Sequence, residues 1–227
     1  MARLLIHVEG QTEEQFFNEL LRGHLLSKGY HSAEARIVGN VRQTGICSWP
    51  SARKEIMYRL REDPGCIATT MVDYYALPQK DAKAWPGRAQ SEGLVSVKQK
   101  ALCVQEAVRN DLSKEMGSKF DIRRFVPFVV MHEFEGLLFS DCSGFSRAID
   151  RPDLETSLQA IRDQFATPEE INDSVVTAPS KRIEALVEGY QKPFHGVLAA
   201  LTITLSRIRQ ECPHFDGWVK QLEARAG

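Results

Sequence analysis

The chain has 227 residues, 43% of them hydrophobic, which is enough for one sizeable core but leaves little room for a second full domain. Its 29 basic and 30 acidic residues nearly cancel, so no overall field draws the protein to a polyanion, and contact with nucleic acid has to come from a local patch. The five cysteines never form a CxxC spacing, which argues against a disulfide framework and against a zinc site.

The stretch LLIHV, residues 4–8, is a short and continuous apolar run, typical of a strand buried on both faces. It ends on Glu9 and Gly10, and hydrophobic residues then recur at helical spacing. Thr12 and Gln15 match the capping-box pattern, which predicts a helix beginning at Thr12. Gly10 allows a tight turn, and the start of the helix offers free backbone N–H groups to an anion.

The same order of strand and helix recurs further along the chain. We expect a second strand over 35–38, a helix over 49–61, and a third strand over 66–72, whose sequence CIATTMV is rich in β-branched residues. Residues 76–93 hold prolines and glycines among charges, which indicates a long surface loop. A helix over 94–115 is predicted from its periodicity.

Residues 125–131, FVPFVVM, form the last predicted strand, in which Pro127 marks an irregular or edge position. The strand pattern then stops, and helices are predicted over 153–165, 180–188, 196–211 and 214–225. The predicted fold class is therefore α/β. A mostly parallel sheet flanked by helices occupies residues 1–140, and a helical C-terminal subdomain over 141–227 packs on it.

Carboxylates follow three of the predicted strands: Glu9 after the first, Asp73 after the third, and Glu133 and Glu135 after the last. The carboxyl ends of parallel strands lie along one edge of the sheet, so these acids can converge. Clustered carboxylates repel one another unless a cation is present, and oxygen ligands suit Mg²⁺ or Mn²⁺ in phosphoryl transfer. The alternative is that acids follow strands because turns are polar. A two-residue offset turns side chains apart, so Glu133, nearer the strand end, ranks ahead of Glu135.

Other polar residues allow both a functional and a structural interpretation. Lys181 could neutralise phosphate charge at the acidic edge, or lie solvated at the start of a helix. Tyr74 and Tyr75 could stack a nucleobase, although aromatic residues after a strand more often complete a core. His132 and His195 are more often packed histidines than ligands or bases. Basic residues around the expected loop could contact nucleic acid, although neighbouring acids favour a solvated loop: Lys80, Lys83, Arg88, Lys98 and Lys100.

Four segments, VEGQTEEQFF, MVDYYALP, HEFEGLLFSD and APSKRIEALVEGYQK, occur in an order that resembles the bacterial family called domain of unknown function 4276, of the Toprim-like clan. The resemblance covers most of the chain and implies a Toprim-like fold. In Toprim domains a glutamate after the first strand acts as acid or base, and an Asp-x-Asp pair holds Mg²⁺. Glu9 matches the glutamate and Asp73 the first aspartate, but Tyr75 replaces the second. Glu133 or Glu135 would then supply the missing carboxylate, as an additional acidic motif does in the related overcoming-lysogenization-defect nucleases.

Together, the residues and the resemblance favour a Mg²⁺-dependent phosphodiesterase or nuclease of Toprim type that acts on nucleic acid in a bacterial defence system. Its expected catalytic residues are Glu9, Asp73, Glu133 and Lys181, and its expected ligands for Mg²⁺ or Mn²⁺ are Glu9, Asp73, Glu133 and Glu135. One alternative is a non-catalytic, Toprim-derived partner of an ABC-type ATPase, because similar genes often accompany such ATPases. The chain has no GxxxxGK[ST] loop of its own. Another alternative is a small-molecule phosphotransferase or phosphatase.

The expected partners are nucleic acid, an ABC-type ATPase and a second copy of the chain. No signal-peptide pattern and no apolar run of the ~20 residues that span a bilayer are present, so we expect a cytoplasmic protein that does not enter the membrane.

Overall fold

A parallel β-sheet forms the centre of the molecule. The computed structural model describes residues 1–38, 46–172 and 175–226. In them, five strands run parallel in the order β2–β1–β3–β4, and β5 also pairs with β3. Their bounds are Arg3–Val8 (β1), Ser32–Ile37 (β2), Cys66–Asp73 (β3), Phe125–Val126 (β4) and Val129–Val130 (β5). The predicted mostly parallel sheet is confirmed, although β2 begins three residues before the predicted position.

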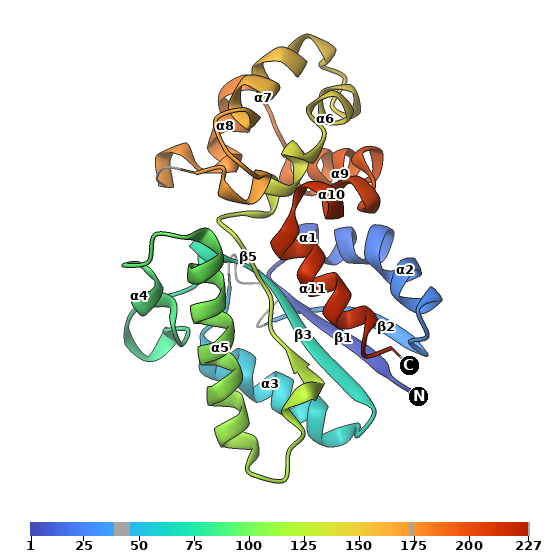
Figure 1. Ribbon diagram of the computed structural model, residues 1–227, viewed down its shortest axis with the longest axis vertical. Coiled ribbons are helices and arrows are strands. Elements are labelled where there is room, and N and C mark those ends of the chain that lie inside the picture. Colours follow the sequence, from blue (N-terminus) through green and yellow to red (C-terminus); the bar gives the residue numbers. More distant parts are fainter. Residues whose placement is uncertain (39–45, 173–174, 227) are drawn as a thin grey trace.

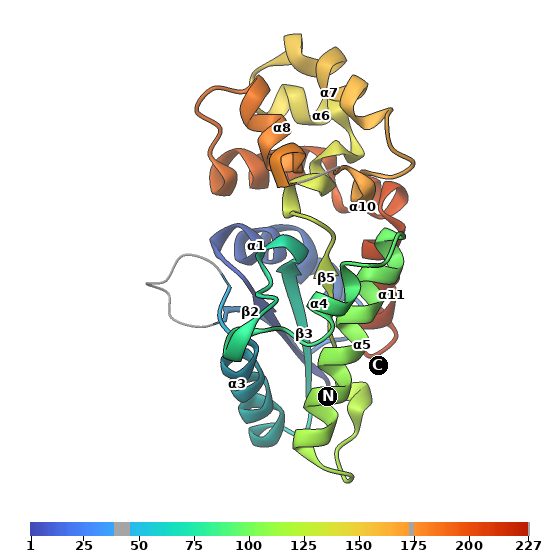
Figure 2. The same ribbon diagram turned by 90° about the vertical axis from the view of Figure 1, so that its left-hand side faces the viewer.

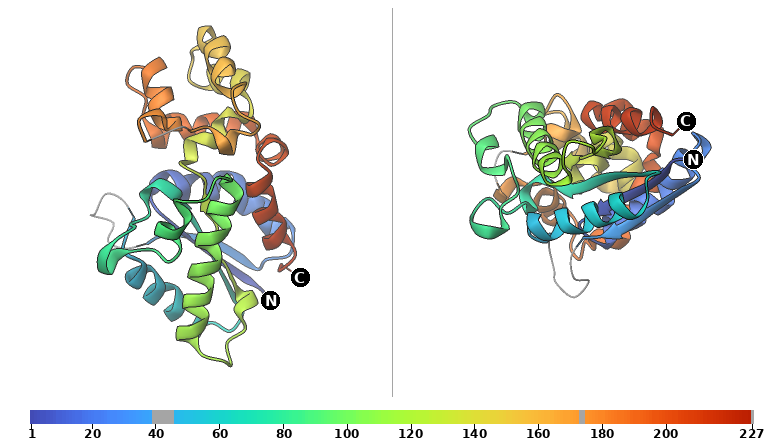
Figure 3. Two further views of the ribbon diagram at one scale, coloured as in Figure 1. Left: turned by 60° about the vertical axis from the view of Figure 1, so that its left-hand side comes forward. Right: turned by 90° about the horizontal axis from the view of Figure 1, so that it is seen from below.

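Helices cover both faces of the sheet, as Figure 3 shows from below. On one face lie α3 (Trp49–Glu62) and α5 (Val97–Met116). The other face carries α1 (Gln11–Phe16), which continues through the π-helical turn Phe17–Leu21 into α2 (Arg22–Ser27), and α11 (Pro213–Glu223). Each face has its own cluster of buried hydrophobic residues, so β1 and β3 are buried on both sides.

A group of short helices lies beyond the carboxyl ends of the strands, at the top of Figures 1 and 2. It consists of α6 (Cys142–Ala148), α7 (Glu155–Arg162), α8 (Pro179–Leu186), α9 (Val197–Ile203) and α10 (Leu205–Glu211). The predicted C-terminal helices are therefore present. The predicted helix over 196–211 is broken, because Thr204 adopts a left-handed conformation with φ of 76° between α9 and α10.

The last helix, α11, packs on the sheet and also contacts α10, whose Arg209 pairs with Asp216 and Glu223 of α11. The Trp218 ring stacks on Phe128 with 4.4 Å between ring centroids, and its Nε1 donates to Thr69 Oγ1 of β3 at 2.8 Å. Tyr30 donates a further hydrogen bond to the carbonyl oxygen of Leu222. These contacts tie the end of the chain to its first half, and the predicted division at residue 140 stays a prediction.

The predicted strand over 125–131 is split at Pro127, which lacks an N–H group for the sheet ladder. Thr70 fills the gap with its side chain. Its hydroxyl donates to the Phe128 carbonyl at 2.8 Å and accepts the Phe128 N–H at 2.9 Å. The irregularity predicted from the proline is therefore present, as two strands of two residues in place of one long strand.

The predicted surface loop over 76–93 is wrong in part, because much of it is folded and buried. It contains the short helix α4 (Arg88–Ser91), and Trp85 and Arg88 are each only 2% exposed. The Arg88 guanidinium lies 3.8 Å from the centre of the Tyr74 ring and donates to the Tyr74 carbonyl. Leaving the Arg88 head unpaired in the core would be costly, and these contacts satisfy it.

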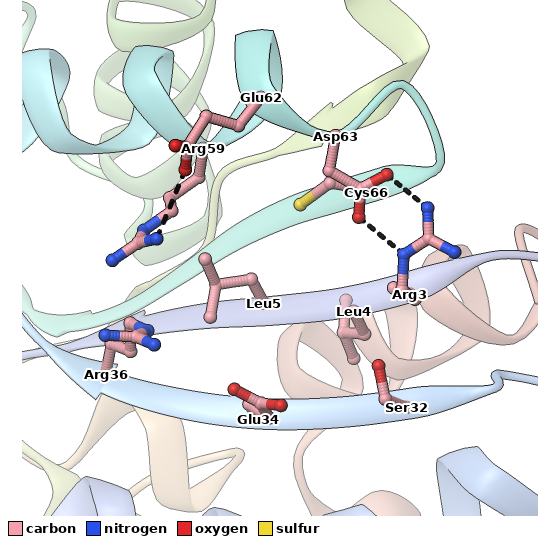
Figure 4. A pocket seen from close by; sticks show the side chains of 10 residues that line it. All are labelled: Arg3, Leu4, Leu5, Ser32, Glu34, Arg36, Arg59, Glu62, Asp63 and Cys66. Carbon is pink, nitrogen blue, oxygen red and sulfur yellow. Dashed lines mark hydrogen bonds and ion pairs between the residues drawn. The ribbon is translucent and has the colours of Figure 1, made fainter.

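A cavity of about 180 Å³ opens at the amino-terminal ends of β1, β2 and β3, between the sheet and the end of α3 (Figure 4). Its charged side chains largely neutralise one another, since Arg3 pairs with Asp63 and Arg59 with Glu62. None of the residues predicted for the functional site lines it. Among the described residues, no helix combines the length and the apolar character that crossing a membrane requires.

Candidate active site

Four carboxylates meet where β1 and β3 end, at the edge of the sheet that faces the helical group. Glu9 directly follows β1, Glu13 lies in the first turn of α1, and Asp73 is the last residue of β3. Glu135 comes from the 3-10 segment Phe134–Ser140, which follows β5. Glu9 Oε2 accepts the backbone N–H of Asp73 at 3.4 Å, which joins the two strand ends.

The ammonium group of Lys192 lies among three of these carboxylates. Its Nζ is 3.1 Å from Asp73 Oδ2, 3.2 Å from Glu135 Oε2 and 3.6 Å from Glu13 Oε1. It also lies 5.9 Å from the centre of the Phe134 ring. We call Glu9, Glu13, Asp73 and Glu135, with Lys192, the acidic cluster. One lysine cannot neutralise four ionised carboxylates, so the cluster favours uptake of protons or of a further cation.

Two residues predicted for the site make other contacts. Glu133 Oε2 accepts the backbone N–H of Ser180 at 2.9 Å, in the first turn of α8. Lys181, whose side chain is 54% exposed, pairs with Glu184 at 2.7 Å. The structure thus brings Glu9, Asp73 and Glu135 together. Glu133 instead bonds to the backbone of α8, and Lys181 pairs with Glu184 within that helix. As predicted from their two-residue offset, the side chains of Glu133 and Glu135 point apart. The predicted ranking was wrong, because Glu135, and not Glu133, contacts Lys192.

The sequence profile of the family called domain of unknown function, DUF4276, matches residues 8–223. The chain belongs to the DUF4276 family. A solved structure of the C-terminal region of the OLD protein from Xanthomonas campestris pv. campestris is similar at 14% sequence identity and a TM-score of 0.43. That alignment covers 100% of this chain and 96% of the other. The sequence matches no curated protein.

Burial dominates the electrostatics of the acidic cluster in this DUF4276 chain. Asp73 is only 4% exposed and Glu135 is fully enclosed. Burial raises the pKa of Asp73 well above its ordinary value; Lys192 opposes that rise, and the neighbouring glutamates add to it. The pKa of Glu135 is raised by burial too, again against the effect of Lys192. Burial disfavours the Lys192 ammonium, but the carboxylates around it more than compensate and raise its pKa.

Two members of the acidic cluster were not predicted from the sequence. Glu13 was not among the expected catalytic or metal-binding residues, and it accepts the Gly10 N–H at 3.1 Å. That contact corrects the predicted capping box, since the helix begins at Gln11 with Gly10 as its N-cap, not at Thr12. The spacing of Glu9 and Glu13 could have indicated this role. Glu13 comes four positions after Glu9, and on a helix that starts just after Glu9 such a residue can face the same site. No local pattern marks Lys192, which lies 119 residues from Asp73.

The oxygens of the acidic cluster fit a divalent cation by their chemistry. Asp73 Oδ1 and Glu135 Oε1 are buried and have no partner among the described residues, whereas Glu135 Oε2 and Glu13 Oε1 face only the Lys192 ammonium. Such buried and unpartnered carboxylate oxygens are costly, and hard oxygen donors are those that Mg²⁺ and Mn²⁺ take. Within the described residues no three acidic, histidine or cysteine side chains are already spaced to hold one ion, and the Lys192 ammonium lies among them instead.

Glu9 gives a testable pH dependence. Burial, and next the charge of Glu13, raise its pKa to about 7, while Lys192 and the Asp73 N–H oppose the rise. A carboxyl whose folded pKa is raised contributes stability that is present below its unfolded pKa and is lost as the pH rises through about 7. Glu9→Gln cannot ionise. In metal-free buffer it should equal the wild type in unfolding free energy near pH 5 and exceed it by roughly 1–3 kcal/mol near pH 8.

Urea unfolding of both proteins across this range, followed by circular dichroism, measures the difference. Glu14→Gln is a suitable control, because Glu14 is the neighbouring acid of α1 outside the acidic cluster. A Glu9→Gln difference that stays constant with pH would show that Glu9 is not the group that titrates.

Proposed function

We propose that this DUF4276 protein is a Toprim-like, metal-dependent phosphodiesterase that cleaves nucleic acid and serves in a bacterial defence system. The observation that carries the proposal is the acidic cluster itself. Carboxylates from β1, α1, β3 and the segment after β5 meet at the carboxyl edge of a parallel sheet, where such folds bind ligands, and they hold a single lysine. A pure packing role does not account for buried charges that are this poorly balanced.

The residues that would hold Mg²⁺ or Mn²⁺ are Glu9, Glu13, Asp73 and Glu135. A bound divalent ion supplies activation of a water nucleophile and neutralisation of charge on the leaving oxygen. Glu133, which was expected as a ligand, lies next to Glu135 but is held by the backbone of α8. It remains a candidate for an outer position, because its charge contributes to the raised pKa of Glu135.

Lys192 and Glu9 have distinct roles in this proposal. Lys192 carries a compact positive charge and is 34% exposed, so its ammonium can turn from the carboxylates to a phosphate of the substrate and neutralise it there. That role had been expected of Lys181. Glu9 has a pKa of about 7, which suits a group that gives or takes a proton at neutral pH.

A second function is favoured by one observation. Tyr75 stands where the Toprim pattern has its second aspartate, and its ring lies 5.3 Å from the ring of His132. A chain that lost one metal ligand could serve as a non-catalytic partner of an ABC-type ATPase. The two functions differ in whether the purified chain cleaves a phosphodiester.

The test is cleavage of supercoiled plasmid, single-stranded DNA and RNA with Mg²⁺ or Mn²⁺, by the chain alone and together with any ABC-type ATPase that is encoded beside it. We expect metal-dependent cleavage by the wild type that falls by about 100-fold or more in Asp73→Asn and stops with a chelator. Cleavage that is equal in Asp73→Asn would place the activity elsewhere. No cleavage of any substrate in either setting would favour the non-catalytic partner.

A further inference from the structure

A second cavity, of about 510 Å³, lies on the side of α4 and α5. Its walls include Tyr74 and Tyr75, which directly follow Asp73, and His132, which precedes Glu133. The Tyr75 N–H donates to the His132 carbonyl at 3.2 Å, so the chain segments after β3 and β5 are joined here. The volume is within the range of small-ligand sites. The cavity therefore borders the two chain segments that carry Asp73 and Glu135.

The two tyrosines of this cavity have different roles. Tyr74 is 1% exposed, lies under the Arg88 guanidinium and bonds Ser91, so it completes the core. Tyr75 is half-buried, and its ring packs at a tilt against His132. A partly open aromatic face beside a phosphodiester site is the feature on which nucleobases stack.

The polar groups of the cavity are those that a nucleotide needs. His132 is 5% exposed, and its Nε2 has no hydrogen-bond partner among the described residues. The Lys100 ammonium also lines the cavity and forms no ion pair with any described residue. The imidazole Nε2 can meet the hydrogen-bonding edge of a base.

The first turn of α5 also borders the cavity, through Val97 and Lys100. This helix has 20 residues, its N-cap Ser96 makes no side-chain capping bond, and its first turn holds no acid. Its free N–H groups therefore favour an anion. Two acids line the cavity as well, but Glu92 is held by Arg88 and Gln79, which leaves Glu170 as the opposing charge.

We propose that this cavity holds one nucleotide of a single-stranded substrate, with the base against Tyr75 and His132 and its phosphate at Lys100 and the first turn of α5. The inference rests on the proposed function, whose substrate class it names. It explains why Tyr75 replaces an acid at this position: an aromatic ring binds a base, whereas a third carboxylate would repel the phosphate.

Calorimetric titration in EDTA tests the proposal without any metal. The probes are the four deoxynucleoside 5′-monophosphates, deoxyadenosine and a 5′-phosphorylated trinucleotide. We expect at least one monophosphate to bind, the trinucleotide to bind at least as tightly, and Tyr75→Ala to weaken both by roughly tenfold while Tyr75→Phe retains binding. Lys100→Ala should weaken the monophosphate and leave deoxyadenosine unchanged.

Lys98→Ala is the matched control, because Lys98 lies on the same turn of α5 but lines a different cavity, and it should bind as the wild type does. Asp73→Asn should also bind, and a wild type that binds these probes but cleaves no substrate would refute only the proposed function. Failure of all four monophosphates, or wild-type affinity in Lys100→Ala, would overturn the proposed pocket even if Tyr75→Ala did not fold. If a monophosphate bound but the trinucleotide did not, the proposal that the substrate is a single-stranded nucleic acid would be overturned.

Discussion

Lys192→Ala should lower the free energy of unfolding of the metal-free protein by about 2–4 kcal/mol, because it removes the cation from a group of buried carboxylates. The acids are 0–6% exposed at their side chains, whereas Lys192 is 34% exposed, so solvent reduces the effect below that of a fully buried pair. Excess Mg²⁺ or Mn²⁺ should restore much of the loss, since a divalent ion can take the place of the ammonium.

Urea unfolding with and without the metal measures both effects. Lys181→Ala is the matched control, because Lys181 also pairs with a glutamate but is exposed, and its loss should cost less than about 0.5 kcal/mol. If Lys192→Ala also lowered the free energy of unfolding by less than about 0.5 kcal/mol, the charges of the carboxylates would not depend on the lysine for compensation. A large loss that no divalent ion reverses would mean that the acidic cluster is built around Lys192 alone.

Glu135→Gln should reduce metal-dependent cleavage by about 100-fold or more, whereas Glu133→Gln should reduce it by less than about tenfold. Glu135 is enclosed and lies 3.2 Å from Lys192, whereas the Glu133 carboxylate is occupied by the N–H of Ser180. The main loss in Glu133→Gln should be in stability, on the order of 1 kcal/mol, because the first turn of α8 loses a charged acceptor.

Cleavage rates at saturating Mn²⁺, together with the thermal unfolding midpoint of each variant, separate the two roles. Both substitutions are isosteric, so neither creates a cavity. Equal losses of activity would make Glu133 a ligand in its own right. A larger loss in Glu133→Gln would reverse the assignment and support the order in which the sequence ranked them.

The strands and their acids could be predicted from the sequence because their signals are local. β1 and β3 are largely apolar and buried, Glu9 follows β1, and Asp73 ends β3. The rule that parallel strands share one carboxyl edge then brings Glu9 and Asp73 together without any further information. Glu135 was included for the same reason, although only the bend after β5 decides which of the two glutamates turns inward.

Lys192 could not be found in this way, because its position depends on the path of the chain through α6, α7 and α8. Its neighbours in sequence, Gln191 and Pro193, give no sign of a buried role. The break at Thr204 and the buried helix α4 were missed for a related reason. Tertiary packing at Trp85 and Arg88 overrides a local composition of prolines, glycines and charges that is typical of loops.

The central claim is that acids from distant parts of the chain share one divalent cation, and calorimetric titration of Mn²⁺ into wild type and Asp73→Asn at neutral pH tests it most directly. Saturable binding to the wild type that weakens at least tenfold in Asp73→Asn is the predicted result. A wild type that binds no Mn²⁺, or an Asp73→Asn variant that binds it equally well, would contradict the claim.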